Sequence, residues 1–236
     1  NEDRGLFRTR DGGLTWEKVL YINDDTGVVE VAMEDNGRVL YAAAYQRRRH
    51  AWGNLTGGPD SGIYRSMDGG TTWEKLGGGL PEGVLGKTAI AIAKSRPNVV
   101  YAAIGDTDGG LFRSEDRGET WEQVNDIRTS YWYGNIYVDP ANENKLWIMG
   151  TQLDLSIDGG KTFENDWTAR GIHVDHHDLQ FFDGSTIYGG CDGGVNYSDN
   201  LANSWTRRPM MANAQYYANS IDFLNPDQIY GGTQDN

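Results

Sequence analysis

The sequence predicts an all-β protein assembled from repeated antiparallel units of four strands each. Three observations favour this class. Glycine, at 32 of 236 residues, and aromatic side chains, at 11%, are frequent while long apolar runs are few, as in proteins of short strands and tight turns. Helical periodicity is almost absent, because no stretch of about a dozen residues places apolar side chains at i, i+3, i+4 and i+7. A phrase with an aspartate, glycines and an aromatic residue recurs along the chain.

The recurring phrase reads RTRDGGLTW, RSMDGGTTW, RSEDRGETW and LSIDGGKTF, and a worn copy reads YSDNLANSW. Its aspartate and aromatic residues are Asp11 and Trp16, Asp68 and Trp73, Asp116 and Trp121, and Asp158 and Phe163; the worn copy keeps Ser198 and Trp205. Successive aspartates are 57, 48 and 42 residues apart. A period of about 40 to 50 residues in strand-rich units is typical of β-propeller blades.

Each unit contains the same four segments in the same order. An apolar first strand, such as TAIAIA, and a turn precede a second strand, such as VVYAAIG; a third strand (GLFRS) enters the phrase, and a fourth (TWEQV) starts at its aromatic residue. We expect one partial propeller over residues 1–236, with half blades at 1–20 and 215–236 and blades at 27–76, 88–124, 134–168 and 176–208. We expect further blades of a longer parent chain to close the ring; the alternative is that the two half blades pair.

The phrase itself is predicted to be a fold device rather than an active site. Ser, Thr and Asp side chains bond backbone N–H groups in turns, and glycine adopts backbone conformations that a Cβ opposes. The aromatic residue is expected to start the fourth strand and to pack between blades. A catalytic site is normally unique in a domain, whereas this motif occurs in nearly every unit.

Charge and cysteine content exclude several classes of partner and bond. The net charge of −13 argues against nucleic acid, because nucleic-acid binding needs a basic face that displaces counterions. A single cysteine, Cys191, excludes an internal disulfide and is expected to be a small buried residue. The sequence contains no apolar stretch of signal-peptide or membrane-span character, so we predict no membrane insertion.

The phrase resembles the Asp-box, or BNR, repeat S/T-x-D-x-G-x-T-W of sialidases, xyloglucanase-type glycoside hydrolases, photosystem assembly factors and sortilin-type Vps10 domains. The segments YAAAYQRRRHAW, HVDHHDL, GGCDGGVNYS and YGGTQDN resemble the large bacterial BNR-repeat proteins described as glycosyl hydrolase-like or sortilin-like. The resemblance implies a secreted, periplasmic or cell-surface protein with a carbohydrate or peptide ligand and no cofactor. It also places ligands on the face where the second strands end, opposite the Asp-box turns.

Polar residues follow the second strand of every unit. They are Gln46, Asp106, Gln152, Asp192, and Gln234 with Asp235. Amide and carboxylate groups donate to and accept from sugar hydroxyls, so these residues are candidates for binding a hydroxyl-rich ligand. The alternative is that polar residues simply follow strands.

The longest insertion, residues 46–62, is basic and aromatic. It carries Arg47, Arg48, Arg49, His50 and Trp52. An indole stacks on sugar rings, and arginines clamp carboxylate or phosphate groups, so this segment is a second candidate ligand site. The alternatives are a solvated loop, or one that pairs with acidic neighbours or another propeller.

A histidine cluster, GIHVDHHDL, stands at the entry to a first strand. Strict alternation would place Asp175 and His177 on one side and His176 and Asp178 on the other. Histidine and aspartate bind Zn²⁺ or act as acid and base, but this spacing fits no established metal signature. We therefore predict a hydrogen-bonded cluster, with Asp192 of the same unit nearby, and assign no metal ligand.

Two functions remain open at this point. A glycoside hydrolase needs two carboxyl groups around one bond, roughly 6.5–9.5 Å apart for inversion and about 5–5.5 Å for retention. The candidate catalytic residues are Asp106, Asp192, Asp235 and Asp175. A non-catalytic propeller that binds a glycan, a peptide or another protein, or that serves as a scaffold, needs no such pair.

Overall fold

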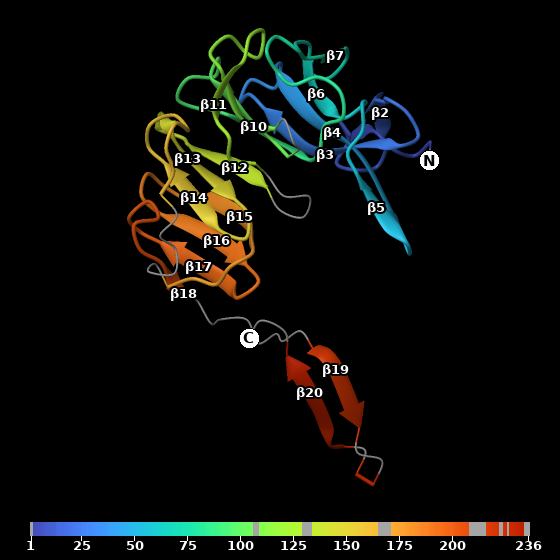
Figure 1. Ribbon diagram of the computed structural model, residues 1–236, viewed down its shortest axis with the longest axis vertical. Coiled ribbons are helices and arrows are strands. Elements are labelled where there is room, and N and C mark those ends of the chain that lie inside the picture. Colours follow the sequence, from blue (N-terminus) through green and yellow to red (C-terminus); the bar gives the residue numbers. More distant parts are fainter. Residues whose placement is uncertain are drawn as a thin grey trace. The chain divides into compact units, whose positions relative to one another are not determined.

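The computed structural model describes residues 2–105, 109–128, 134–164, 171–207, 216–221, 224–225 and 227–233. Within these ranges every regular element is a β-strand and every strand pairing is antiparallel, so the all-β prediction is confirmed (Figure 1). The chain divides into two compact units, residues 1–165 and 166–236, and each is described by itself. No helix among the described residues is long and apolar enough to cross a membrane.

Unit 1 contains four sheets in chain order. The strands are β1 (Leu6–Arg8) with β2 (Glu17–Leu20); β3 (Thr26–Met33), β4 (Leu40–His50), β6 (Gly62–Ser66) and β7 (Glu74–Lys75), with β5 (Gly53–Thr56) paired to β4; β8 (Thr88–Ile92), β9 (Val100–Ile104), β10 (Gly110–Ser114) and β11 (Glu122–Asn125); and β12 (Asn135–Asp139), β13 (Asn142–Met149) and β14 (Leu153–Ser156). In the last sheet, where the repeat predicts a fourth strand, the residues described up to 164 form an isolated bridge between Leu155 and Glu164.

Unit 2 contains one sheet of four strands and one hairpin. The strands are β15 (His176–Phe181), β16 (Ile187–Cys191), β17 (Gly194–Ser198) and β18 (Thr206–Arg207), and then β19 (Tyr216–Ile221) with β20 (Ile229–Thr233). The order of the first sheet follows the chain, as it does in the sheets of unit 1.

The strand register gives each sheet two distinct ends. Thr26 pairs with Gln46, and Asn135 pairs with Met149, so the first strand begins where the second strand ends. We call this end of each sheet its rim. Leu40 pairs with Ser66 at the opposite end, which is where the third strand runs into the Asp-box turn.

The core of unit 1 consists of apolar layers between consecutive sheets. One cluster includes Ile63, Ile90 and Phe112, and the other includes Leu111 and Ile148; all are nearly inaccessible to solvent. Successive side chains of a strand point to opposite faces, so Leu111 and Phe112 of β10 face different neighbouring sheets. Strands buried on both faces explain why the second strands read as continuous runs of small and apolar residues.

Each Asp-box turn is closed by its own side chains. The Ser66 hydroxyl donates to Asp68 Oδ1 (2.8 Å), and Asp68 accepts the Thr72 N–H (2.8 Å) and hydroxyl (2.7 Å). The Gly70 N–H bonds the Ser66 oxygen, and Gly70 has φ of 82°, a conformation that glycine adopts readily. The Trp73 indole N–H donates to the Gly70 carbonyl (3.3 Å).

The same bonds recur in the other boxes and lower the pKa of the aspartates. The threonine hydroxyl and N–H hold the pKa of Asp11, Asp116 and Asp158 at about 2. The box aromatics differ in burial. Trp121 lies in one core cluster of unit 1, Phe163 packs against the other cluster, and Trp16 is largely exposed. Packing between blades therefore holds for Trp121 and Phe163 but not for Trp16, whose indole lies over Gly13 of its own turn.

An arginine clamp links each of the first three boxes to the box of the next sheet. The arginine before the box serine or threonine reaches the residue that follows the next box aspartate. Arg8 donates to the Gly69 carbonyl (2.6 Å), and Arg65 donates to the Arg117 carbonyl (2.7 Å). Arg113 lies against Gly159, where an added Cβ would be 3.1 Å from its Nη1. The repeat thus specifies contacts between sheets as well as turns.

Candidate functional site

A histidine–aspartate pair lies at the rim of the β15–β18 sheet. His177 Nε2 is 2.5 Å from Asp192 Oδ1, and the two side chains are 51% and 26% exposed. The Asp192 N–H donates to the Asp175 carbonyl (3.1 Å), which ties the entry of β15 to the turn after β16. Two predicted candidates, Asp192 and His177, are therefore in direct contact, and Asp175 adjoins them through its backbone.

A β-bulge directs His177 to the surface. His176 pairs with Cys191 and Asp178 pairs with Gly190, so His177 is the extra residue in β15. The bulge makes both His177 and Asp178 exposed, while His176 is buried. The prediction that His176 and Asp178 share one side is wrong for this reason, because regular alternation does not continue through a bulge.

His176 belongs to the interior of the sheet rather than to its surface. Burial lowers its pKa to about 4, and the neighbouring His177 and His173 act in the same direction, so the imidazole is neutral at pH 7. Its strand partner Cys191 is also buried, and the Cys191 sulfur accepts from Asn196 Nδ2 (3.3 Å). Among the described residues, no group of three His, Cys, Asp or Glu side chains is arranged to hold a metal ion.

The basic insertion of unit 1 forms a hairpin rather than an irregular loop. Strand β4 continues past the rim residue Gln46, and β5 pairs only with this extension, from Arg47 opposite Thr56 to His50 opposite Gly53. We call residues 47–56 the arm. Figure 1 shows β5 running outward from the β3–β7 sheet.

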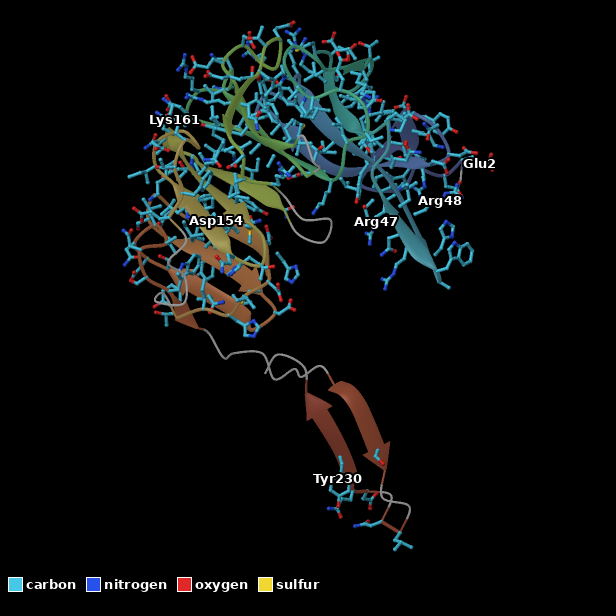
Figure 2. The ribbon with its side chains drawn as sticks, viewed as in Figure 1. Glu2, Arg47, Arg48, Asp154, Lys161 and Tyr230 are labelled. Atoms are coloured by element: carbon cyan, nitrogen blue, oxygen red, sulfur yellow. The ribbon has the colours of Figure 1, made fainter. Side chains whose placement is uncertain are left out.

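The arm carries an aromatic stack and several cations. The rings of His50 and Trp52 are stacked, with centroids 4.8 Å apart and an interplanar angle of 10°, and Trp52 is 85% exposed. Arg48, which is labelled in Figure 2, forms an ion pair with Asp25. At the base, Arg4 donates to the Arg47 carbonyl (3.0 Å), and Arg49 is exposed along the arm.

The remaining rim candidates differ in position. Gln46 lies at the base of the arm with its side-chain amide packed over Gly58, where an added Cβ would be 1.8 Å from Oε1. Gln152 is exposed in the connection between β13 and β14, and its carbonyl accepts the Gly150 N–H (2.7 Å). The candidates Asp106, Gln234 and Asp235 lie outside the described residues.

Two carboxyl groups with raised pKa values were missed by the sequence reasoning. Glu30 of β3 accepts the Ile90 N–H (3.1 Å), and burial raises its pKa to about 7. Burial also raises the pKa of Asp154, labelled in Figure 2, which is the second residue of β14 and so lies close to the rim. The sequence did hold a signal for Asp154, because it stands two residues before the box serine, where Tyr64 and Phe112 stand in earlier units.

Comparisons with known proteins support the repeat and the fold. The model of the BNR-Asp box repeat matches residues 111–124, which span β10, the box of Asp116 and Trp121, and β11. No curated protein sequence matches the chain.

The solved structures that are similar to the chain include two GH74 enzymes and a nidogen/laminin complex. The GH74 enzyme of Niastella koreensis is 20% identical with a TM-score of 0.57, and the alignment covers 89% of this chain and 34% of that one. The GH74 xyloglucanase of Xanthomonas campestris is 19% identical with a TM-score of 0.55, with coverage of 88% and 35%. A nidogen/laminin complex chain is 13% identical with a TM-score of 0.52, with coverage of 80% and 67%. The chain spans about a third of the length of the two GH74 structures.

Proposed function

We propose that this chain, a β-propeller built of BNR-Asp box repeats, binds carbohydrate at the rims of its sheets. The observation that carries the proposal is that polar side chains open to solvent stand at the rims of two sheets. Gln152 at one rim and the His177–Asp192 pair at another are partly or fully open to solvent. Amide, imidazole and carboxylate groups together both donate to and accept from hydroxyl groups, which is the chemistry that sugars present.

The His177–Asp192 pair is the most defined element of this proposed surface. The carboxylate orients the imidazole ring through Oδ1. A carboxylate has a second oxygen with which to accept from a hydroxyl. Hydrogen bonds that involve a charged partner contribute about 1.5–3 kcal/mol each. A ligand that bridges both residues would therefore lose roughly ten-fold or more in affinity when one is removed.

Glycoside hydrolysis is a second candidate function, and the raised pKa of Asp154 favours it. A glycosidase acid needs a raised pKa, and Asp154 near the rim of its sheet has one because it is partly buried. Asp192 would serve less readily as that acid, because His177 already occupies one of its oxygens. We therefore propose binding as the primary activity and treat sugar release as the measurement that would change this view.

The resemblance also motivates proposals about context. We propose that residues 27–76, 88–124, 134–168 and 176–208 are separate blades, and that the parent protein is exported and contributes further blades. Fractionation of the source cells tests export, because an exported protein is recovered outside the cytoplasm. Recovery of the protein in the cytoplasmic fraction alone would overturn this part of the proposal.

The test uses the full chain and a panel of plant, microbial and sialylated polysaccharides. Affinity electrophoresis compares the wild type with Asp192→Asn and His177→Ala, and Asp199→Asn serves as the matched control because Asp199 is exposed at the box end of the same sheet. The expected result is retention by at least one polysaccharide that both rim variants lose and the control keeps. No retention by any polysaccharide, or retention that both rim variants keep, overturns the proposal.

Two other outcomes would redirect it. Release of reducing sugar that Asp192→Asn or Asp154→Asn abolishes would make the protein a glycoside hydrolase. Retention on an immobilised protein, without retention on any polysaccharide, would make it a protein-binding propeller.

A further inference from the structure

The arm differs in charge from the rest of the molecule. Residues 46–59 contain three arginines and a histidine and no aspartate or glutamate, although the whole chain has 34 acidic residues and a net charge of −13. A basic segment on an acidic protein attracts anionic ligands locally, while the remaining surface repels them. Any ligand of the arm is therefore expected to be anionic and to approach from this side.

The pairing of the arm sets its two faces. Residues directly opposite each other in antiparallel strands share a face, so Arg48 and Leu55 lie on one face and Arg49 and Asn54 lie on the other. His50 is two residues from Arg48 and thus belongs to the face of Arg48 and Leu55. That face combines an aromatic stack, an apolar side chain and a cation, and Asp25 already pairs with the cation.

The tip of the arm provides a flat apolar surface of fixed orientation. Trp52 is 85% exposed, yet its stacking on His50 holds the indole plane. Tryptophan is enriched at binding interfaces, where one side of its ring system packs on a partner. The face of a pyranose ring carries C–H groups that pack on such a plane, whereas an extended acidic peptide has no equivalent flat surface.

We propose that the arm binds an acidic polysaccharide that passes over its tip, so that sugar rings pack on Trp52 and uronic-acid carboxylates contact arginines of the arm, among them Arg49 on the face opposite Arg48. This inference rests on the proposed function and adds to it the class of carbohydrate. The arginines recognise the charge, because guanidinium groups match carboxylates in geometry, and the indole distinguishes a sugar from any other polyanion. The arm extends beyond the rim of its sheet, so a long polymer can contact the arm without contacting the rim.

The experiment measures binding of the full chain to four soluble polymers at low salt. Polygalacturonate is the acidic polysaccharide, dextran and xyloglucan are neutral ones, and poly-L-glutamate is a polyanion without sugar rings. The variants are Trp52→Ala, Trp52→Phe and Arg49→Gln. Arg96→Gln and Phe182→Ala are the matched controls, because both residues are exposed in turns at the box ends of their sheets.

The wild type is expected to prefer polygalacturonate over both neutral polymers and poly-L-glutamate. Trp52→Ala should weaken that binding about ten-fold, Trp52→Phe should restore most of it, and Arg49→Gln should weaken it about three- to five-fold. Raising the salt from 50 to 500 mM should weaken it further, and the two controls should leave it unchanged.

The failures are distinguishable. Binding to neutral polysaccharides alone leaves the proposed function standing and overturns the role of the arm. Equal binding to poly-L-glutamate, or binding to polygalacturonate that survives both Trp52→Ala and Arg49→Gln, overturns the inference as well. Binding to none of the polysaccharides overturns the proposed function together with the inference.

Discussion

Replacing Arg65 by methionine tests whether the arginine clamp couples consecutive sheets. The Arg65 side chain is only 6% exposed. Its Nη1 donates to the Arg117 carbonyl (2.7 Å), and its Nη2 is 2.5 Å from Glu74 and 2.6 Å from Glu119. Methionine keeps an unbranched stem of similar length, so the substitution removes the donors while it preserves most of the packing.

The contacts give the expected loss of stability. The hydrogen bond from the Arg65 guanidinium to the Arg117 carbonyl contributes about 1.5–3 kcal/mol. Glu74 and Glu119 are 57% and 66% exposed, so each ion pair adds only about 0.2–1 kcal/mol. Removing the guanidinium also removes the cost of its desolvation, which offsets part of the loss. We expect Arg65→Met to lower the free energy of unfolding by about 2–3 kcal/mol, and Arg65→Lys to lower it by less.

Urea unfolding followed by tryptophan fluorescence measures this change on the full chain. The midpoint should fall by about 1 M for a loss of this size. Arg10→Met is the matched control, because Arg10 is exposed in the first box and its replacement should change stability by less than about 0.5 kcal/mol. An Arg65→Met midpoint equal to that of the control would refute the idea that the clamp holds neighbouring sheets together.

Three further predictions concern the turns and the interior of unit 1. The box aspartates Asp11, Asp116 and Asp158 have a pKa of about 2 in the fold against 3.8 in the unfolded chain. The stability that they contribute is therefore present above pH 4 and is lost as the pH falls from about 4 to 2. Acid titration of the circular dichroism signal measures this loss. Glu30 has its pKa raised from 4.5 to about 7, so the stability that its neutral form contributes is full below pH 4.5 and is lost as the pH rises from about 4.5 to 7. Glu30→Gln should therefore remove part of the difference between the melting temperatures at pH 5 and pH 8. Gly86→Ala should lower the free energy of unfolding by about 1–3 kcal/mol or more, because the added Cβ would lie 1.6 Å from the Gly105 carbonyl oxygen. Gly53→Ala is the control: its Cβ would meet no atom within 4 Å, so this variant should have the melting temperature of the wild type.

The sequence predicts the strands and turns of this protein well because the box is local. Ser66, Asp68 and Thr72 bond one another within seven consecutive residues, so the motif alone specifies the turn. The positions of the strands are then predicted from their spacing in the sequence relative to each box. The clamp from Arg65 to Arg117 joins residues 52 positions apart, and its partner is visible only once neighbouring units are known to stack in register.

The candidate site was less predictable, for two physical reasons. The alternation rule assumes continuous pairing, and the bulge at His177 changes which histidine faces solvent. The rule that polar residues follow strands also says nothing of what a side chain meets there, and Gln46 packs over Gly58 while Gln152 is exposed. The same rule does not predict Asp154, because this partly buried aspartate lies inside a third strand and departs from the pattern of its own repeat.

His176 leads to a last prediction, about the acid sensitivity of unit 2. Its pKa is about 4 in the fold against 6.5 in the unfolded chain, because burial disfavours the charged imidazole. A lowered folded pKa means that the stabilisation is complete above pH 6.5 and is lost as the pH falls toward 4. At about 1.36 kcal/mol for each pKa unit, the loss by pH 4 amounts to about 3 kcal/mol.

Urea midpoints at pH 7 and pH 4.5 measure this loss, and His176→Gln should remove most of it, since glutamine carries no titrating group. His177→Gln is the matched control, because it replaces the neighbouring half-exposed imidazole and leaves His176 in its buried position. The acid range of His176 lies above that of the box aspartates, so the two contributions separate along one pH titration. If His176→Gln and His177→Gln lose stability equally between pH 7 and 4.5, burial of His176 is not the cause, and the bulge does not separate an interior histidine from a surface one.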